Sequence, residues 1–450
     1  MEKKLKSTNE KPSKIIEFFT AVQAGNCRKV RKMLKLKDVD INDTNPSECT
    51  NTTALIIACQ LELFDMVDLL LKTKPKPPNV NSETTTGCRA IWWAVKHGNI
   101  QLTKLLLSTN KCEVNFTEKE TGYTLLYRAI LSNSPAIVKE LLHAGADVNT
   151  KLHFDSGAVT PLIKQSLTKT NVFHCCILSN CFYRAIQMNN LDICQLLINN
   201  LCNLHAVIEN GCTALHIAVV LRRYEICELL LESGSKVNAK SKAGVTAMTI
   251  AIEQHNPYMV RLLLQYGYKM DRQYSWRETP LEQAIRLHSD KCAITLLLWG
   301  CKLSKKSRPS YLYMAVSEKL WNVVHFLVEL NPMCLQETWL KKKQWPVAVY
   351  CDEALRQHIL ELSTQVFSLK ELCRSKVFRC IGRFAPVKLV ELPLPAPLID
   401  YMMFREFIKE DFYDKIALEK IICPYDCPVI CSQWDCYPLD ISVSSDSEEY

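Results

Sequence analysis

The sequence predicts an all-α solenoid of stacked helix-pair repeats. An alanine recurs every 33 residues, at Ala218, Ala251 and Ala284, and each lies five residues after a threonine that can cap the start of a helix. Apolar residues at helical spacing follow each alanine and predict a second helix. One helix pair of this size cannot bury its own apolar face, so neighbouring pairs must stack.

The same alanine position, at which two helices are expected to approach closely, recurs before Ala218 and after Ala284. We call it the anchor alanine. It predicts about nine repeats between residues 15 and 337, after a polar N-terminal tail over 1–14. The anchors are Ala21, Ala58, Ala94, Ala129, Ala185, Ala218, Ala251, Ala284 and Ala315. Ala348 lies 33 residues beyond Ala315 and is expected to anchor a degenerate last unit in the connector 338–367.

Each repeat is expected to end at a glycine. This C-terminal cap needs a residue with positive φ, and glycine adopts positive φ without steric cost. The glycines that close second helices are Gly145, Gly234, Gly267 and Gly300.

The interval from Ala129 to Ala185 is longer than the others. It spans 56 residues, which is one period plus 23, and the surplus falls at about 152–180. This segment contains a second opening, Thr160-Pro-Leu162, whose unit is never completed. We expect a surface insertion here, with a loop that contacts a target protein as the alternative.

The T-x-L-x-x-A opening and the L-L-x-x-G-A-x-V-N close resemble the ankyrin repeat. Units that open at Thr213 and Thr246 match closely, as does the segment 141–149, while the units of Ala21 and Ala315 are weaker, as terminal units usually are. The resemblance implies a stack that binds other proteins.

Composition and motifs argue against other classes of function. The net charge is +8 and no Lys/Arg run exceeds 341–343, so nucleic acid is not indicated. No apolar stretch approaches the roughly 18 residues that span a bilayer, so we expect no membrane association and a cytoplasmic location, with the nucleus left open. Phosphate-binding glycine loops and hydrolase or protease motifs are absent from the sequence, so neither an enzyme nor a cofactor is predicted.

Cysteine and histidine are expected to be structural. Most of the 22 cysteines fall within helical patterns, where they act as small hydrophobes, as at Cys59, Cys194, Cys227 and Cys292. His216 is expected to be a buried histidine bonded to local backbone. No metal is predicted at either of two candidate clusters. The first lacks the usual C-x₂-C pairing, whereas the second has a regular x₃, x₃, x₄ spacing, so a metal site is the alternative there to a loosely packed extension. The first cluster is His174, Cys175, Cys176 and Cys181, and the second is Cys423, Cys427, Cys431 and Cys436.

A different organisation begins at Ser368, where Ser368 and Glu371 form a capping box. The helix that follows carries an apolar face, while Lys370, Arg374, Ser375 and Lys376 are polar; Gly382 ends it. The residues of the apolar face are Leu369, Leu372, Cys373, Val377 and Cys380. One interpretation is a helix that only caps the stack.

Prolines at 393, 395 and 397 follow and predict an extended segment over 392–398. Pro397 can then begin a short helix over 398–404, with Leu398, Tyr401 and Met402 on one side. So much apolar surface in a small element is expected to be covered by partners.

Together these pieces, residues 368–404, resemble the SOCS box. The first motif matches the family's BC-box, which implies that Leu369, Leu372, Cys373 and Val377 dock Elongin C of the Elongin B/C pair. The second matches its cullin box of the cullin-5 type, which implies cullin binding. Its residues are Leu392, Pro393, Leu394, Pro395, Leu398 and Tyr401.

The whole chain therefore resembles the ankyrin-repeat and SOCS-box family. The resemblance implies a non-catalytic substrate receptor that recruits Elongin B/C and cullin-5 with its RING subunit to an unknown protein target for ubiquitination and degradation. The alternative is an ankyrin scaffold without ligase recruitment; an F-box-like terminus fits the proline pattern poorly. A departure from the family is the 405–450 extension, which contains the second cysteine cluster and ends in the acidic stretch 444–449.

Overall fold

The computed structural model describes residues 2–36, 39–74, 76–150, 181–208, 210–271, 278–303, 310–364, 366–382 and 385–404. Within these ranges the regular secondary structure is helical, and four isolated β-bridges join residues of the connecting hairpins. The chain divides near residue 206 into two compact units, each described by itself.

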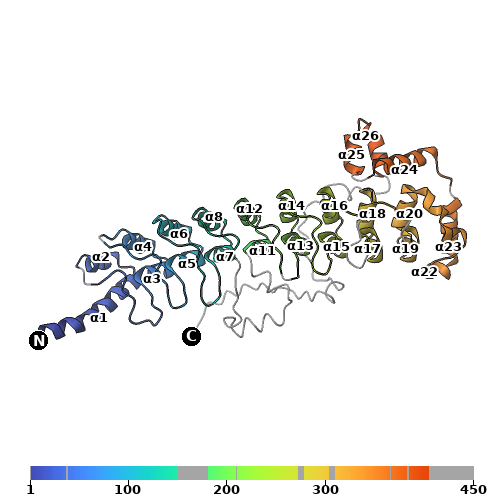
Figure 1. The fold of residues 1–450 in the computed structure, drawn as a ribbon. Helices are drawn as coiled ribbons and strands as arrows, with labels where there is room; N and C mark the ends of the chain where they lie inside the picture. The colour runs from blue at the N-terminus through green and yellow to red at the C-terminus, as the bar shows by residue number, and fades with distance from the viewer. Residues whose placement is uncertain are drawn as a thin grey trace. The chain divides into compact units, whose positions relative to one another are not determined.

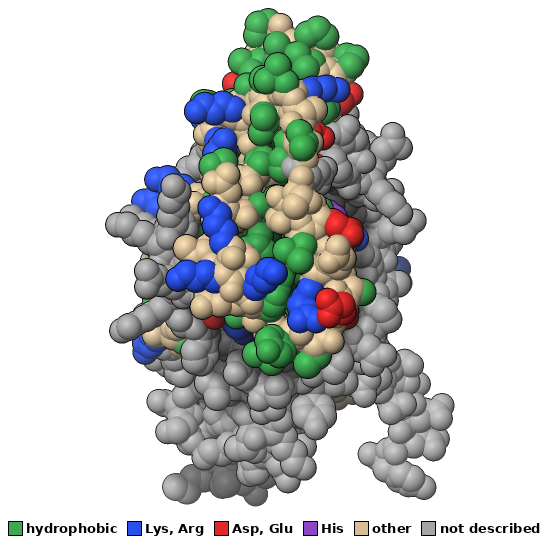
Figure 2. Space-filling view, turned by 90° about the vertical axis from the view of Figure 1, so that its right-hand side faces the viewer, with side chains coloured by type: hydrophobic (Ala, Val, Ile, Leu, Met, Phe, Trp, Pro, Cys, Tyr) green, Lys and Arg blue, Asp and Glu red, His purple; other side chains and the backbone are tan. Residues whose placement is uncertain are grey.

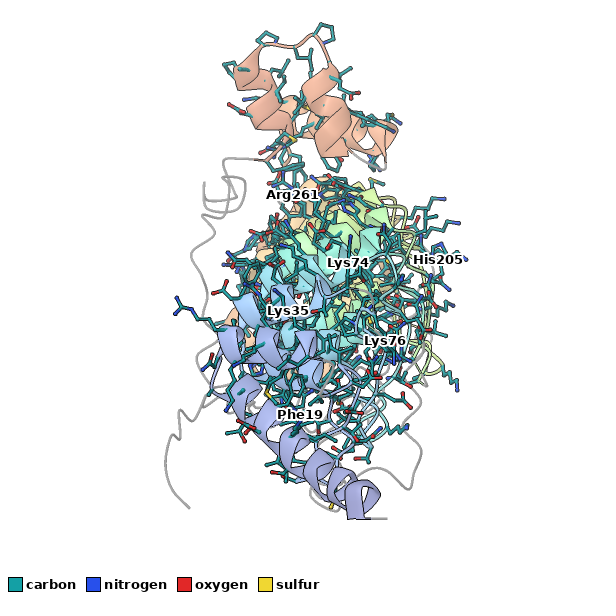
Figure 3. All side chains as sticks on the ribbon, turned by 90° about the vertical axis from the view of Figure 1, so that its left-hand side faces the viewer. Phe19, Lys35, Lys74, Lys76, His205 and Arg261 are labelled. Carbon is teal, nitrogen blue, oxygen red and sulfur yellow. The ribbon has the colours of Figure 1, made fainter. Side chains whose placement is uncertain are left out.

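The described residues of the first unit form five helix pairs. The first helices α1, α3, α5, α7 and α11 pack in one row, and the second helices α2, α4, α6, α8 and α12 in another (Figure 1). Their bounds are α1 Glu2–Gln23, α2 Cys27–Lys35, α3 Ala54–Gln60, α4 Phe64–Leu71, α5 Ala90–Lys96, α6 Ile100–Leu107, α7 Leu125–Leu131, α8 Pro135–His143, α11 Cys181–Gln187 and α12 Leu191–Asn199. Helix α1 begins at Glu2 and so includes the residues expected to form a polar tail. Its inner end is anchored by Phe19, which is 2% exposed (Figure 3).

The second unit contains four further pairs and a C-terminal extension. The pairs are α13 Ala214–Val220 with α14 Tyr224–Glu232, α15 Ala247–Glu253 with α16 Pro257–Gln265, α17 Pro280–Arg286 with α18 Asp290–Leu298, and α19 Tyr311–Ser317 with α20 Trp321–Leu330. The connector holds η1 Pro332–Gln336, α21 Thr338–Lys341, α22 Val347–Tyr350 and α23 Glu353–Thr364. The chain then forms α24 Leu369–Ile381, α25 Ala385–Glu391 and α26 Ala396–Met402.

The nine predicted anchor alanines are confirmed as packing positions. All nine, from Ala21 to Ala315, are at most 4% exposed, because the two helices of a pair approach too closely there for a larger side chain. The prediction for Ala348 was wrong. Ala348 is exposed and its neighbour Val349 is fully buried, because the four-residue helix α22 does not continue the repeat register.

The predicted caps are also present. Thr124 and Thr279 accept hydrogen bonds from the backbone N–H three residues on, and the glycine of each closing turn has the left-handed backbone that the position requires. The φ angles are +85° at Gly145, +87° at Gly234, +82° at Gly267 and +77° at Gly300.

His216 is a buried structural histidine, as expected. It is 1% exposed, and its Nδ1 accepts a hydrogen bond from the backbone N–H of Thr213 at 3.1 Å. Because Nδ1 is an acceptor, the proton lies on Nε2, which donates to the backbone oxygen of Val245 at 3.2 Å. Burial lowers the pKa of His216 below its ordinary value.

The expected buried cysteines are confirmed. Cys59, Cys194, Cys227 and Cys292 are all 0% exposed. Burial raises the pKa of the Cys194 thiol to about 12, so this side chain stays neutral and packs as a small apolar group.

The repeat register passes directly from Asn149 to residue 181. Asn115 bridges to the next repeat by donating to Gly145 O at 2.9 Å and accepting from the Asp147 N–H at 2.9 Å. Asn149 makes the same bridge, but to Leu201 O at 3.3 Å and the Asn203 N–H at 2.8 Å. These partners lie more than 50 residues ahead instead of about 30, and α11 packs on α7, which supports an insertion at 152–180.

The remaining candidate sites can be placed only in part. The 152–180 insertion, the cluster at 174–176 and the cysteines of the 405–450 extension lie outside the described residues. Cys181 of the first cluster is buried on α11. The described part of the chain contains no group of three or more potential metal ligands, and none of its helices combines the length and apolar character needed to cross a membrane.

Candidate functional site

Helix α24 begins at a complete capping box. The Ser368 hydroxyl accepts a hydrogen bond from the Glu371 backbone N–H at 3.3 Å, and the Glu371 carboxylate accepts one from the Ser368 backbone N–H at 2.6 Å. The bond from the Ser368 backbone N–H, and after it a bond of 2.9 Å from the Ser368 hydroxyl to the same carboxylate oxygen, hold the pKa of Glu371 below its ordinary value. The helix start is therefore fixed by local sequence, as predicted.

The predicted apolar face of α24 is exposed. Leu369 is 79% exposed, Leu372 44% and Val377 41%, and Cys373 is exposed between them. These residues recur at helical spacing, so they form one continuous surface. Exposed apolar residues gathered on one face are typical of protein-binding sites.

The opposite face of α24, which contains polar residues, is the buried one. Arg374 and Ser375 are each 1% exposed, and both contact α20. Arg374 Nη2 donates to Glu329 Oε2 at 2.6 Å, and Ser375 Oγ donates to the Leu330 backbone oxygen at 3.0 Å. Two polar residues of α24, Arg374 and Ser375, thus attach the helix to the last repeat.

An aromatic cluster completes this attachment. Phe378 on α24 is 3% exposed, and its ring lies 5.5 Å from that of the fully buried Phe404, edge to face. The Phe404 ring also lies 5.1 Å from Phe326 of α20. These phenylalanines were not predicted to be an anchor, although Phe378 follows Arg374 by one helical turn and shares its face.

The proline segment differs from expectation in two respects. A helix, α25, occupies 385–391 before it, and α26 begins at Ala396 rather than 398, so the extended part is shorter than predicted. Met402 is 6% exposed whereas Leu398 is 42% exposed. The two residues predicted to share a side of the helix therefore have different environments.

The predicted cullin-box residues lie mostly at the surface. Leu392 is 39% exposed, Pro393 and Pro395 are exposed, and Leu394 is half-buried. Tyr401 brings this motif against α24, because Lys370 Nζ lies 3.9 Å from the centre of its ring. Arg374 Cζ lies 4.3 Å from the same ring.

The two predicted motifs thus belong to one small helical domain with an exposed apolar surface. Helices α24, α25 and α26 lie at the top of the view in Figure 1, and hydrophobic side chains gather at the same end of the space-filling view (Figure 2). This domain offers an exposed apolar surface for another polypeptide.

Family models match both parts of the chain. A model described as ankyrin repeats (3 copies) matches residues 18–115, 65–151 and 155–241, and a model of the SOCS box matches residues 365–403. Both are interaction domains rather than catalytic domains. No curated protein matches the chain in sequence.

Solved structures of ankyrin domains are similar at a low level. The human ASB11 ankyrin repeat domain is 22% identical, with a TM-score of 0.40, and the match covers 55% of this chain and 97% of that one. The ankyrin repeat domain of Bcl-3, a member of the IkappaB protein family, is 21% identical with a TM-score of 0.40, over 52% of this chain and 92% of that one.

Proposed function

Because the chain belongs to the ankyrin-repeat and SOCS-box family, we propose that it is a substrate-recognition adaptor of a cullin-5 RING ubiquitin ligase. The ankyrin repeats hold a target protein, and the SOCS box recruits Elongin B/C and cullin-5 with its RING subunit. The observation that carries this proposal is the exposed apolar face of α24.

Elongin C covers that face in the proposed complex. Leu369 and Cys373 lie one turn apart on α24, and Leu372 and Val377 flank them. Burying an exposed leucine contributes roughly 1.5–3 kcal/mol, so a few such residues account for stable docking. At Cys373 a small side chain suits a closely packed pocket, and a bulky one would clash.

The cullin contacts the neighbouring segment. Leu392, Pro393, Leu394 and Pro395 form a stiff surface strip, because proline restricts the backbone on either side of it. Leu398 and Tyr401 on α26 complete this surface. Elongin C and the cullin would then bind adjoining parts of one domain.

The chain contributes proximity rather than chemistry. Holding a target near a charged ubiquitin carrier raises the effective concentration of the target's lysines, which is sufficient to direct transfer by the partner subunits. The target is then ubiquitinated and degraded. We place this activity in the cytoplasm, with the nucleus as a second compartment.

A scaffold without ligase recruitment is the second candidate. The contacts of Arg374 and Phe404 with α20 support it, because they would also serve a helix that only caps the stack. A cap, however, gives no reason for Leu369 to be 79% exposed.

Co-purification separates the two. The double variant Leu369→Ala/Cys373→Phe should lose capture of Elongins B and C while its helical circular dichroism stays unchanged. A matched control is Val347→Ala/Cys351→Phe, which alters an exposed valine and an exposed cysteine at the same spacing near α22 and should capture both Elongins normally. A wild-type chain that captures neither Elongin contradicts the ligase proposal.

A further inference from the structure

The first-helix row of the first unit has one side without acidic residues. Positions −1, +2 and +3 relative to each anchor alanine fall on one side of a seven-residue helix. Across five repeats these positions hold no aspartate or glutamate. They are Thr20, Gln23, Ala24, Ile57, Gln60, Leu61, Trp93, Lys96, His97, Arg128, Leu131, Ser132, Arg184, Gln187 and Met188.

Three cations and a tryptophan concentrate on α5, α7 and α11. We call Trp93, Lys96, Arg128 and Arg184 the cation–tryptophan face. Trp93, Arg128 and Arg184 occupy the same register position in successive repeats and are half-buried, and Lys96 is exposed. Because α5 packs on α7 and α7 on α11, these side chains lie in adjoining positions.

Two cations of this face contact aromatic rings, and the third, Arg184, donates from Nη1 to the neutral Gln187 Oε1 at 2.6 Å. Lys96 Nζ lies 4.6 Å from the Trp93 ring centre, and Arg128 Cζ lies 5.8 Å from that of Trp92. Among the residues the structure describes, neither they nor Arg184 has a carboxylate within ion-pair distance. Half-buried cations without a counter-charge favour an anionic ligand, because the low local dielectric strengthens the attraction.

Two acidic residues of the hairpins pair with cations outside this face. Glu113 pairs with Arg89 at 2.5 Å and Glu83 pairs with Lys119 at 3.2 Å. Two polar hydrogens of the face also lack acceptors within the described ranges, those of Trp93 Nε1 and Arg184 Nε. Both of these donors are themselves buried, so what the surface of the face offers a ligand is its uncompensated positive charge.

We infer that the cation–tryptophan face binds an extended acidic segment of the target protein, with carboxylates spaced about three residues apart. Packed helices lie about 8–10 Å apart, and an extended chain in the polyproline II conformation advances about 3.1 Å per residue with about three residues per turn. Every third side chain therefore lies on the same side of the segment and meets the next helix. A carboxylate would face each of Lys96, Arg128 and Arg184, and an apolar residue of the segment would lie on Trp93. This inference rests on the proposed role of the repeats in holding the target.

Fluorescein-labelled peptides test the inference on the full chain. One peptide carries glutamate at every third position with leucine and serine between, and its partner carries glutamine in place of each glutamate. The glutamate peptide should bind on the order of tenfold more tightly, and added salt should reduce the difference. Equal binding of the two peptides would overturn the inference.

Two charge-reversed variants locate the site. Arg128→Glu/Arg184→Glu should abolish the preference for glutamate. Arg31→Glu/Lys139→Glu changes the charge equally at exposed positions on α2 and α8 and should preserve it. The assignment to this face is refuted if only Arg31→Glu/Lys139→Glu loses the preference for the glutamate peptide, or if both variants lose it equally.

Elongin capture by the same variants keeps the two proposals apart. Both variants should still capture Elongins B and C, because their substitutions lie in the repeats rather than in α24. Normal Elongin capture without peptide preference rejects only the acidic-segment inference. Peptide preference without Elongin capture rejects only the ligase role.

Discussion

Arg374 of α24 and Glu329 of α20 form a buried ion pair, with Nη2 and Oε2 2.6 Å apart. Arg374 is 1% exposed, and its guanidinium carbon also lies 4.3 Å from the ring centre of Phe404. The pair ties the C-terminal domain to the last repeat through the face of α24 opposite to its apolar surface. Its position explains how that surface stays outward.

Removing the arginine should loosen this attachment. Arg374→Ala leaves the Glu329 carboxylate without this partner, and breaking a buried pair in this way costs about 3–5 kcal/mol. In this variant the amide hydrogen exchange of α24 and α26 should be faster than in the wild type, whereas the exchange of α13–α18 should stay the same. Lys376→Ala, at an exposed position of the same helix, is the control and should leave exchange unchanged. Unaltered protection of α24 in Arg374→Ala would show that the pair does not hold the domain.

The anchor positions should differ sharply in their tolerance of larger side chains. Ala251→Leu adds volume at a fully buried contact between helices and should destabilise the protein by about 1–3 kcal/mol. Ala348→Leu makes the same change at an exposed position and should have almost no effect. Urea unfolding followed by circular dichroism measures both, and equal losses would contradict the assigned packing.

Acid should destabilise the protein through His216. Burial lowers its folded pKa, so below the unfolded value of about 6.5 the unfolded chain binds a proton that the folded chain excludes. The stabilising contribution is therefore complete above this value and is lost as the pH falls below it and through the lower folded pKa. Protonation would place a hydrogen on Nδ1, directly facing the N–H of Thr213.

The matched variant is His216→Gln, which cannot titrate. Between about pH 7.5 and pH 5.5 the wild type should lose more stability than the variant, by at most about 1.4 kcal/mol for each pH unit, because a single proton is taken up by the unfolded chain alone. Urea unfolding at the two pH values gives the comparison. Identical pH dependence in both proteins would exclude a role for this histidine.

The repeats could be predicted from sequence because their signals are local. Ala218, Ala251 and Ala284 lie at a fixed spacing, and each cap lies within a few residues of the helix that it starts or ends. The same reasoning failed at Ala348. This residue keeps the 33-residue spacing from Ala315, but the four-residue helix α22 is too short to bury its side chain. Periodicity alone does not show where a stack ends.

The arrangement of the C-terminal domain could be predicted only in part. Leu369 and Cys373 were identified from their spacing, but both faces of α24 contain apolar residues, and Phe378 lies on the other one. Which face packs inward depends on Glu329 and Leu330, which lie 45 residues before their partners Arg374 and Ser375. Such long-range pairing has no signature in a helical pattern.

Alkylation of Cys373 tests the central claim most directly. Its thiol is exposed on the apolar face of α24, and the exposed Cys351 at the end of α22 provides an internal reference. In the isolated native chain both should react readily with N-ethylmaleimide, as followed by peptide mass spectrometry. Adding purified Elongin B/C should protect Cys373 and leave Cys351 reactive. A Cys373 that is unreactive in the native chain, or equally reactive with and without Elongin B/C, would contradict an open docking face.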